Sequence, residues 1–130
     1  MYPQGRGRKI MREVTVTEVA DVLDEAVRER GESFVYSPPG TICQYLHGTQ
    51  PGCLVGHVLI RLGAIPGELA LQEGQPADQV DYQSLGLRIP ENAIDALQAA
   101  QIEQDEGRTW GQARKAFNGA LGRFNAPLNA

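Results

Sequence analysis

Apolar residues recur at the 3.6-residue spacing of a helix in the segment 16–30, and charged residues fill the opposite face. Thr15 and Glu18 stand three residues apart at the start of this segment, which is the spacing of a capping box. Gly31 follows the last periodic residue and suits the left-handed conformation that commonly ends helices. The pattern predicts a helix over 16–30 with an apolar stripe made of Val19, Val22, Leu23, Ala26 and Val27.

A second helix is predicted over 53–62, where the residues are apolar on nearly all sides. Such a pattern is typical of a helix that lies at the centre of a domain. Gly56 inside it is unfavourable by about 1 kcal/mol relative to Ala unless another segment packs closely there. Gly63 is suited to cap this helix. Beyond it, we expect a short turn or helix over 66–71 and one helical turn within 77–85.

Two long helices are predicted near the C-terminus, over 90–106 and 110–123. So few residues join them that we expect an antiparallel helical hairpin, with Gly107 in a left-handed or tight conformation. Thr109 opens the last helix as part of a second capping box. Trp110 begins the apolar stripe of that helix, so we expect it in the core. The stripe predicted for the preceding helix consists of Ala93, Ile94, Leu97, Ala100, Gln101 and Ile102.

Acidic residues crowd the end of the predicted 90–106 helix, where they oppose the helix dipole. They are Glu103, Asp105 and Glu106. The short Asp105 side chain could accept from amides of the next helix, and we prefer this capping role to a solvated end.

A small β element is predicted after the first helix. The run 41–47 is rich in residues that favour strands, and 33–36 reads as a shorter strand before it. The Ser-Pro-Pro-Gly sequence between them excludes a helix and favours a turn. We therefore predict a β-hairpin from these two runs, followed by a loop over 48–52. With about four helices, this gives a mainly α fold of the α+β type.

A chain of 130 residues suits one globular domain, which we place over 13–124. The segment 1–12 holds four basic residues and no acid, which predicts a flexible basic tail, and 125–130 should fray. The other 8 basic and 16 acidic residues give 13–130 a net charge of −8. This acidic body argues against nucleic-acid binding, because it repels phosphates.

The chain contains no apolar stretch near the ~20 residues that a membrane span needs, and it begins without a signal peptide. We therefore expect a cytoplasmic protein that does not bind membranes. In that compartment, Cys43 and Cys53 are expected as reduced thiols or metal ligands rather than as a disulfide.

Cysteine and histidine residues form the pattern C-x3-H-x5-C-x3-H, at Cys43, His47, Cys53 and His57. Residues four apart share one face of a strand or of a helix, so two ligand pairs could converge on a zinc ion. The alternative is that both thiols are small buried hydrophobes and both histidines lie at element ends near water. We prefer this alternative and expect no cofactor, with zinc as the metal to test.

Cys53 also begins the predicted central helix, where the helix dipole lowers the pKa of a thiol. A cysteine nucleophile with His57 or His47 as its base is therefore a further hypothesis. The sequence identifies no third orienting residue and none of the common catalytic or phosphate-binding motifs. We accordingly assign no catalytic residue and favour a protein that is not an enzyme.

Two segments resemble a known group of proteins. They read Pro-Gly-Cys-Leu-Val-Gly-His-Val-Leu-Ile-Arg-Leu-Gly at 51–63 and Gln-Ile-Glu-Gln-Asp-Glu-Gly-Arg-Thr-Trp at 101–110. They are similar to small proteins of unknown function from actinobacterial phages, mycobacteriophages especially. A more distant similarity is to a bacterial and phage domain-of-unknown-function family. The resemblance extends over 16–124 in the order of its features.

The resemblance implies a phage-encoded accessory protein made inside the bacterial host. Such proteins commonly bind host or phage proteins, and the family supplies no catalytic residue. We therefore expect a non-enzymatic, protein-binding module of the host cytoplasm, and self-association into a homo-oligomer stays open. A zinc-binding protein and a cysteine-dependent enzyme remain the two alternatives.

Overall fold

The computed structural model of the chain describes residues 11–36 and 44–122. Over these residues, the fold is mainly α with a small β part, as the sequence predicts. The helices are α1 (Val16–Arg30), α2 (Leu54–Arg61), α3 (Pro66–Ala70), α4 (Glu91–Asp105) and α5 (Trp110–Ala120), and Ala77–Gln79 forms one 3-10 turn, η1.

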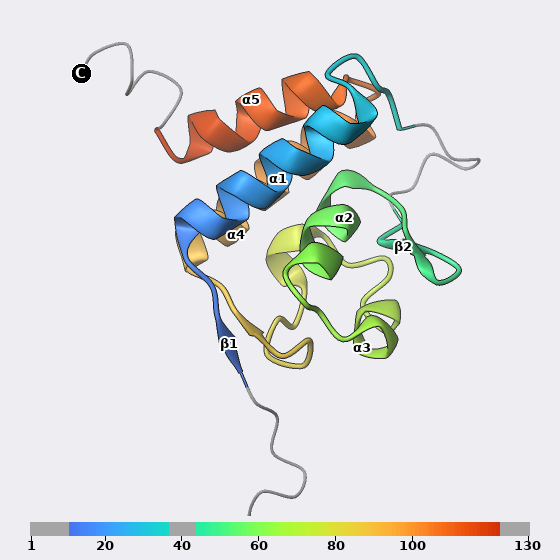
Figure 1. The fold of residues 1–130 in the computed structure, drawn as a ribbon, viewed down its shortest axis with the longest axis vertical. Helices are drawn as coiled ribbons and strands as arrows, with labels where there is room; N and C mark the ends of the chain where they lie inside the picture. Colours follow the sequence, from blue (N-terminus) through green and yellow to red (C-terminus); the bar gives the residue numbers. More distant parts are fainter. Residues whose placement is uncertain (1–10, 37–43, 123–130) are drawn as a thin grey trace, which may run out of the picture.

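The long helices α1, α4 and α5 lie alongside one another, and α2 packs against α1 and α4 (Figure 1). The predicted capping box of α1 is present: Thr15 Oγ1 accepts from the Glu18 amide at 3.1 Å, and the Glu18 carboxylate accepts from the Thr15 amide at 2.8 Å. Thr109 and Gln112 form the equivalent box at the start of α5. These caps fix where two of the three long helices begin.

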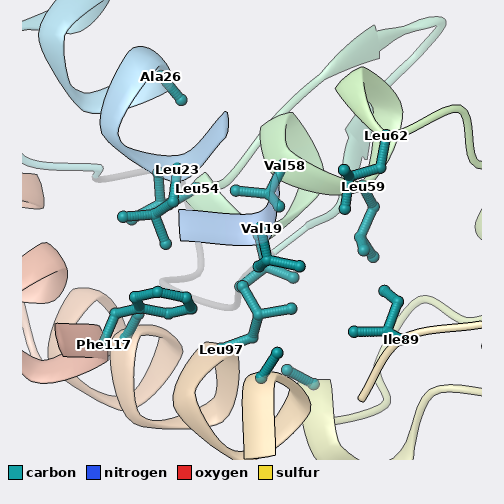
Figure 2. Close-up of a cluster of buried hydrophobic side chains, with 14 of the residues drawn as sticks. Val19, Leu23, Ala26, Leu54, Val58, Leu59, Leu62, Ile89, Leu97 and Phe117 are labelled. Atoms are coloured by element: carbon teal, nitrogen blue, oxygen red, sulfur yellow. The ribbon is translucent and has the colours of Figure 1, made fainter. Parts of the chain in front are cut away.

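The core forms where α2 meets the long helices (Figure 2). Five of the eight α2 residues are buried, which confirms the central position predicted from its apolar sequence. Figure 2 shows its side chains against those of α1, α4 and α5; the labelled residues are Val19, Leu23, Ala26, Leu54, Val58, Leu59, Leu62, Ile89, Leu97 and Phe117.

The last two helices form the predicted antiparallel hairpin, and Gly107 has the predicted left-handed backbone, with φ of +88°. The predicted α4 stripe is wrong in one respect, because Ile102 is 46% exposed while Gln104 is buried. The buried α4 positions are Ala93, Ala96, Leu97, Ala100, Gln101 and Gln104.

The predicted β-hairpin is wrong in its pairing. The antiparallel pair joins β2 (Leu46–His47), at the end of the predicted 41–47 strand, to β3 (Gln50–Pro51), which lies in the segment that was expected to be a loop. Gly48, with φ of +65°, allows the tight turn between them. Val35 instead forms an isolated β-bridge with Thr109. The Trp110 amide, which begins α5 and has no partner within the helix, donates to the Phe34 carbonyl beside this bridge. Residues 41–43 of the predicted 41–47 strand lie outside the described residues.

A parallel pair that the sequence did not predict joins β1 (Arg12–Glu13) to β4 (Leu87–Arg88). The Arg12 backbone amide donates to the Gly86 carbonyl at 2.9 Å. The Arg12 guanidinium donates hydrogen bonds to the Glu18 carboxylate and to the Leu62 carbonyl. The assignment of residue 12 to a flexible tail is therefore wrong. Residues 1–10 and 123–130, which hold the rest of the predicted tail and the predicted frayed end, lie outside the described part.

Gly56 lies where α2 passes directly over the backbone of Tyr45. A Cβ atom at this position would collide with the Tyr45 carbonyl oxygen, so another segment does pack closely against this glycine. Gly67 in α3 offers a matched comparison, because a Cβ atom there would meet no other atom within 4 Å.

Gly56→Ala should lower the free energy of unfolding by about 2 kcal/mol or more, because neither backbone can move aside without losing core contacts. Gly67→Ala should be neutral or slightly stabilising, because Ala favours helix and the site has room. Urea denaturation of both variants measures the difference. Equal stability of the two variants would contradict the close contact between α2 and Tyr45.

Candidate functional site

Two glutamine side chains of α4 point into the protein, where Gln101 is 4% and Gln104 is 2% exposed. Buried amides are costly unless hydrogen-bonded, so their partners show what these residues do. Both lie on the face of α4 that also carries Leu97 and Ala100.

Gln104 joins three segments through one side chain. Its Oε1 accepts from the Leu54 amide at 2.9 Å and from Trp110 Nε1 at 3.0 Å, and its Nε2 donates to Asp105 at 3.0 Å. Asp105 therefore does not cap α5, contrary to our expectation; the cap comes from Thr109. Cys53, which precedes α2, makes no side-chain cap, so the hydrogen-bond partner of the first α2 amide, that of Leu54, is Gln104.

Gln101 makes a corresponding link to the segment between α3 and α4. Its Oε1 accepts from the Ala77 amide at 2.7 Å, and its Nε2 donates to the Tyr45 hydroxyl at 3.1 Å. That hydroxyl donates to the Gln75 carbonyl, and burial raises the pKa of Tyr45 to about 12. The Glu73 carboxylate accepts from the backbone amide of Tyr45 at 2.9 Å. The buried polar groups are thus used to hold loops on the helices.

Trp110 is fully buried, which confirms its predicted place in the core. Its ring meets those of Phe34 and His57 edge to face, at centroid distances of 4.8 and 5.4 Å. His57 Nε2 is buried and has no hydrogen-bond partner among the residues of the described structure. Burial, with further contributions from Arg30 and Arg61, lowers the pKa of His57 to about 4. His57 is therefore a neutral side chain packed against the indole.

The residues of the predicted zinc site are placed as follows. His47 Nε2 lies 2.7 Å from the Tyr36 hydroxyl, and the two rings are stacked. His57 packs against Trp110, and Cys43 lies outside the described residues. Over 11–36 and 44–122, no group of three His, Cys, Asp or Glu side chains is placed to hold a metal ion.

Cys53 is fully buried and disulfide-bonded, so our expectation of a reduced thiol is wrong for this state. That expectation was based on the expected cytoplasmic location. The sequence could not show whether a second sulfur lies close enough to Cys53 to form a disulfide. A disulfide sulfur is neither a thiolate ligand nor a nucleophile. The zinc and cysteine-enzyme hypotheses therefore stay predictions that concern the reduced protein.

An open groove runs along the surface where the end of α4 meets α5. It has a volume of about 480 Å³ and is lined by Glu103, Arg108, Gln112, Lys115 and Ala116. This volume lies within the usual range of ligand-binding clefts. The last four of these residues follow one face of α5 and its N-terminal flank, because they recur at helical spacing. The polar groups of the groove are the cations of Arg108 and Lys115, the amide of Gln112 and the carboxylate of Glu103.

The chain matches no protein-family model, no curated protein and no solved structure. Among the described helices, none is long and apolar enough to cross a membrane.

Sequence reasoning missed both Gln104 and the groove. A signal for Gln104 was available, because it continues the spacing of Ala93, Leu97 and Ala100 along one helix face. A polar residue at such a position indicates a buried hydrogen bond. The groove had no signal of its own, since its shape depends on how α4 and α5 pack.

Gln104→Met should lower the free energy of unfolding by about 2–4 kcal/mol, because the buried Leu54 amide and Trp110 indole would both lose their acceptor. Gln98→Met is the control: Gln98 accepts from the exposed Asp78 amide, which water can satisfy, so its loss should cost under about 1 kcal/mol. Chemical denaturation compares the two. Similar losses would mean that the buried bonds contribute no more than a surface bond.

His57 should make the protein less stable as the pH falls from about 6.5 to about 4. In this window the unfolded chain takes up a proton that the folded chain, with its lowered pKa, does not. The full shift corresponds to about 3 kcal/mol, which we halve to about 1.5 kcal/mol because the ring is partly exposed. Arg30, Arg61, Glu29 and His47 are the charged or titratable groups that influence His57.

Thermal melts of the native protein and of His57→Phe between pH 7 and 4 measure this effect. The variant should lose stability less steeply in that window, since it has no imidazole to protonate. An unchanged pH dependence would show that other groups account for it.

Proposed function

We propose that this chain is a small, non-enzymatic protein-binding module that acts on a host or phage protein in the bacterial cytoplasm. The phage origin and the cellular setting rest on the resemblance of 51–63 and 101–110 to actinobacterial phage proteins. The observation that supports binding is the open groove between the end of α4 and α5.

The groove suits a protein partner because it is open and its walls belong to two rigidly joined helices. Gln112 is held by the cap of α5, where its side chain accepts from the Thr109 amide at 3.0 Å. Arg108 is held by Glu103 at 3.1 Å. A surface that is ordered before binding loses little entropy when a partner docks, which favours affinity.

The polar groups of the interior point to the same function. The side chains of Gln101, Gln104 and Tyr45 are engaged in hydrogen bonds within the chain. Gln104 links the two helices of the groove through Trp110, whereas Gln101 and Tyr45 hold the segment around Gln75 and Ala77 on α4. The groups that contact solvent at the groove are the ones offered to a partner.

Capture from a lysate of an actinobacterial host tests the proposal, with the full chain immobilised. Ala116→Tyr fills the groove, whereas Ala70→Tyr adds the same side chain to an exposed position on α3. We expect one host protein to be retained by the native chain and by Ala70→Tyr, and its affinity for Ala116→Tyr to fall at least about tenfold.

Retention of no protein would contradict a binding function, and equal retention by both variants would exclude the groove as the docking site. The capture is run with and without reductant, because the cytoplasm keeps most thiols reduced. Zinc analysis of the reduced chain tests the metal alternative in the same preparation: stoichiometric zinc would favour it.

A further inference from the structure

Most cations of the described structure are already engaged. Arg61 lies 3.0 Å from Glu25 and 2.6 Å from Glu29, which joins α2 to α1. Arg114 joins α5 to α1 through Asp24 and to the segment that follows α1 through Glu32. Three further ion pairs join Arg12 to Glu18, Arg28 to Asp24 and Arg88 to Glu13, and Arg30 lies over the rings of Phe34 and Trp110.

Lys115 differs from all of these. It is exposed, it lines the groove, and no carboxylate of the described residues lies within ion-pair distance of it. The helix α5 that carries it contains no acidic residue. Lys115 is therefore the cation that the described fold leaves available for another molecule.

Arg108 adds a second positive group at the same groove. Its two carboxylate contacts, to Glu103 at 3.1 Å and to Glu106 at 3.4 Å, both use Nη1. Its side chain is 46% exposed, and exposed pairs of this kind are weak. A guanidinium binds carboxylates through a fork of two nitrogens, so Arg108 can donate to a further carboxylate from its other terminal nitrogen.

We infer that the groove binds an acidic segment of the partner protein, with its carboxylates on Lys115 and Arg108 and a small apolar side chain beside Ala116. This inference rests on the proposed function and specifies the chemistry of the partner. Complementary charge at an open site fixes orientation and speeds association more than it adds affinity. The interaction should therefore be moderate in strength and sensitive to salt.

A long polyanion fits the same surface less well. Residues 13–130 carry a net charge of −8, and Glu103 and Glu106 flank the groove. A nucleic acid would place its phosphates against this negative body, whereas a short acidic segment places its charge only at the two cations. The charge distribution therefore favours a peptide.

The test uses the full chain labelled with ¹⁵N and a fluorescein-labelled peptide of sequence Glu-Glu-Leu-Glu-Glu-Leu, with the Lys-for-Glu peptide as its comparison. We expect saturable binding of the acidic peptide and amide shifts centred on Arg108, Gln112 and Lys115. Lys115→Glu should weaken binding about tenfold. Arg28→Glu makes the same change of net charge at an exposed position of α1 and should weaken binding less than about threefold.

Three outcomes would overturn the inference: no saturable binding of the acidic peptide, equal losses in Lys115→Glu and Arg28→Glu, or tighter binding of a duplex DNA oligonucleotide at the same residues. The protein captured from lysate separates this inference from the proposed function. If Ala116→Tyr abolishes its capture and Lys115→Glu does not, the groove is a docking site but its partner is not recognised through acidic groups.

Discussion

The hydrogen bonds of Gln104 are the interaction on which the rest of the fold depends. One buried amide oxygen accepts from the first amide of α2 and from the indole of Trp110, while it is itself carried by α4. Without Gln104, the Leu54 amide and the Trp110 indole N–H would be buried without a hydrogen-bond partner, at a cost of about 1–3 kcal/mol each. The positions of α2 and α5 relative to α4 are therefore coupled, and the groove beside Lys115 depends on that coupling.

Gln101 extends the same principle along α4 toward the loops. Its amide ties the 3-10 turn at Ala77 and the hydroxyl of Tyr45 to the helix, and the Tyr45 backbone is in turn the surface against which Gly56 packs. Apolar packing supplies most of the driving force of folding, but it does not specify one arrangement by itself. In this protein two buried glutamines favour the observed arrangement, because a packing that separates them from their partners would leave buried polar groups without hydrogen bonds.

The sequence predicted the features that arise locally. The capping box at Thr15, the left-handed Gly107 and the enclosed central helix each follow from a few neighbouring residues, and the structure confirms them. Features that depend on distant partners were missed or misplaced. The spacing along α4 could have indicated that Gln104 is buried, but not that its partners are Leu54 and Trp110. The bridge from Val35 to Thr109 likewise depends on where α5 lies, which no short-range pattern encodes. The sequence analysis assigned no site role to the residues that line the groove, because the groove forms only when α4 and α5 pack together.

Native-state hydrogen exchange of the Leu54 amide tests the central role of Gln104 most directly. Amides of a helix's first turn usually exchange through local fraying, because they have no partner within the helix. If Gln104 holds this amide, Leu54 should exchange only through global unfolding, with a free energy within about 1 kcal/mol of the global value. Exchange through a local opening several kcal/mol below that value would contradict the account.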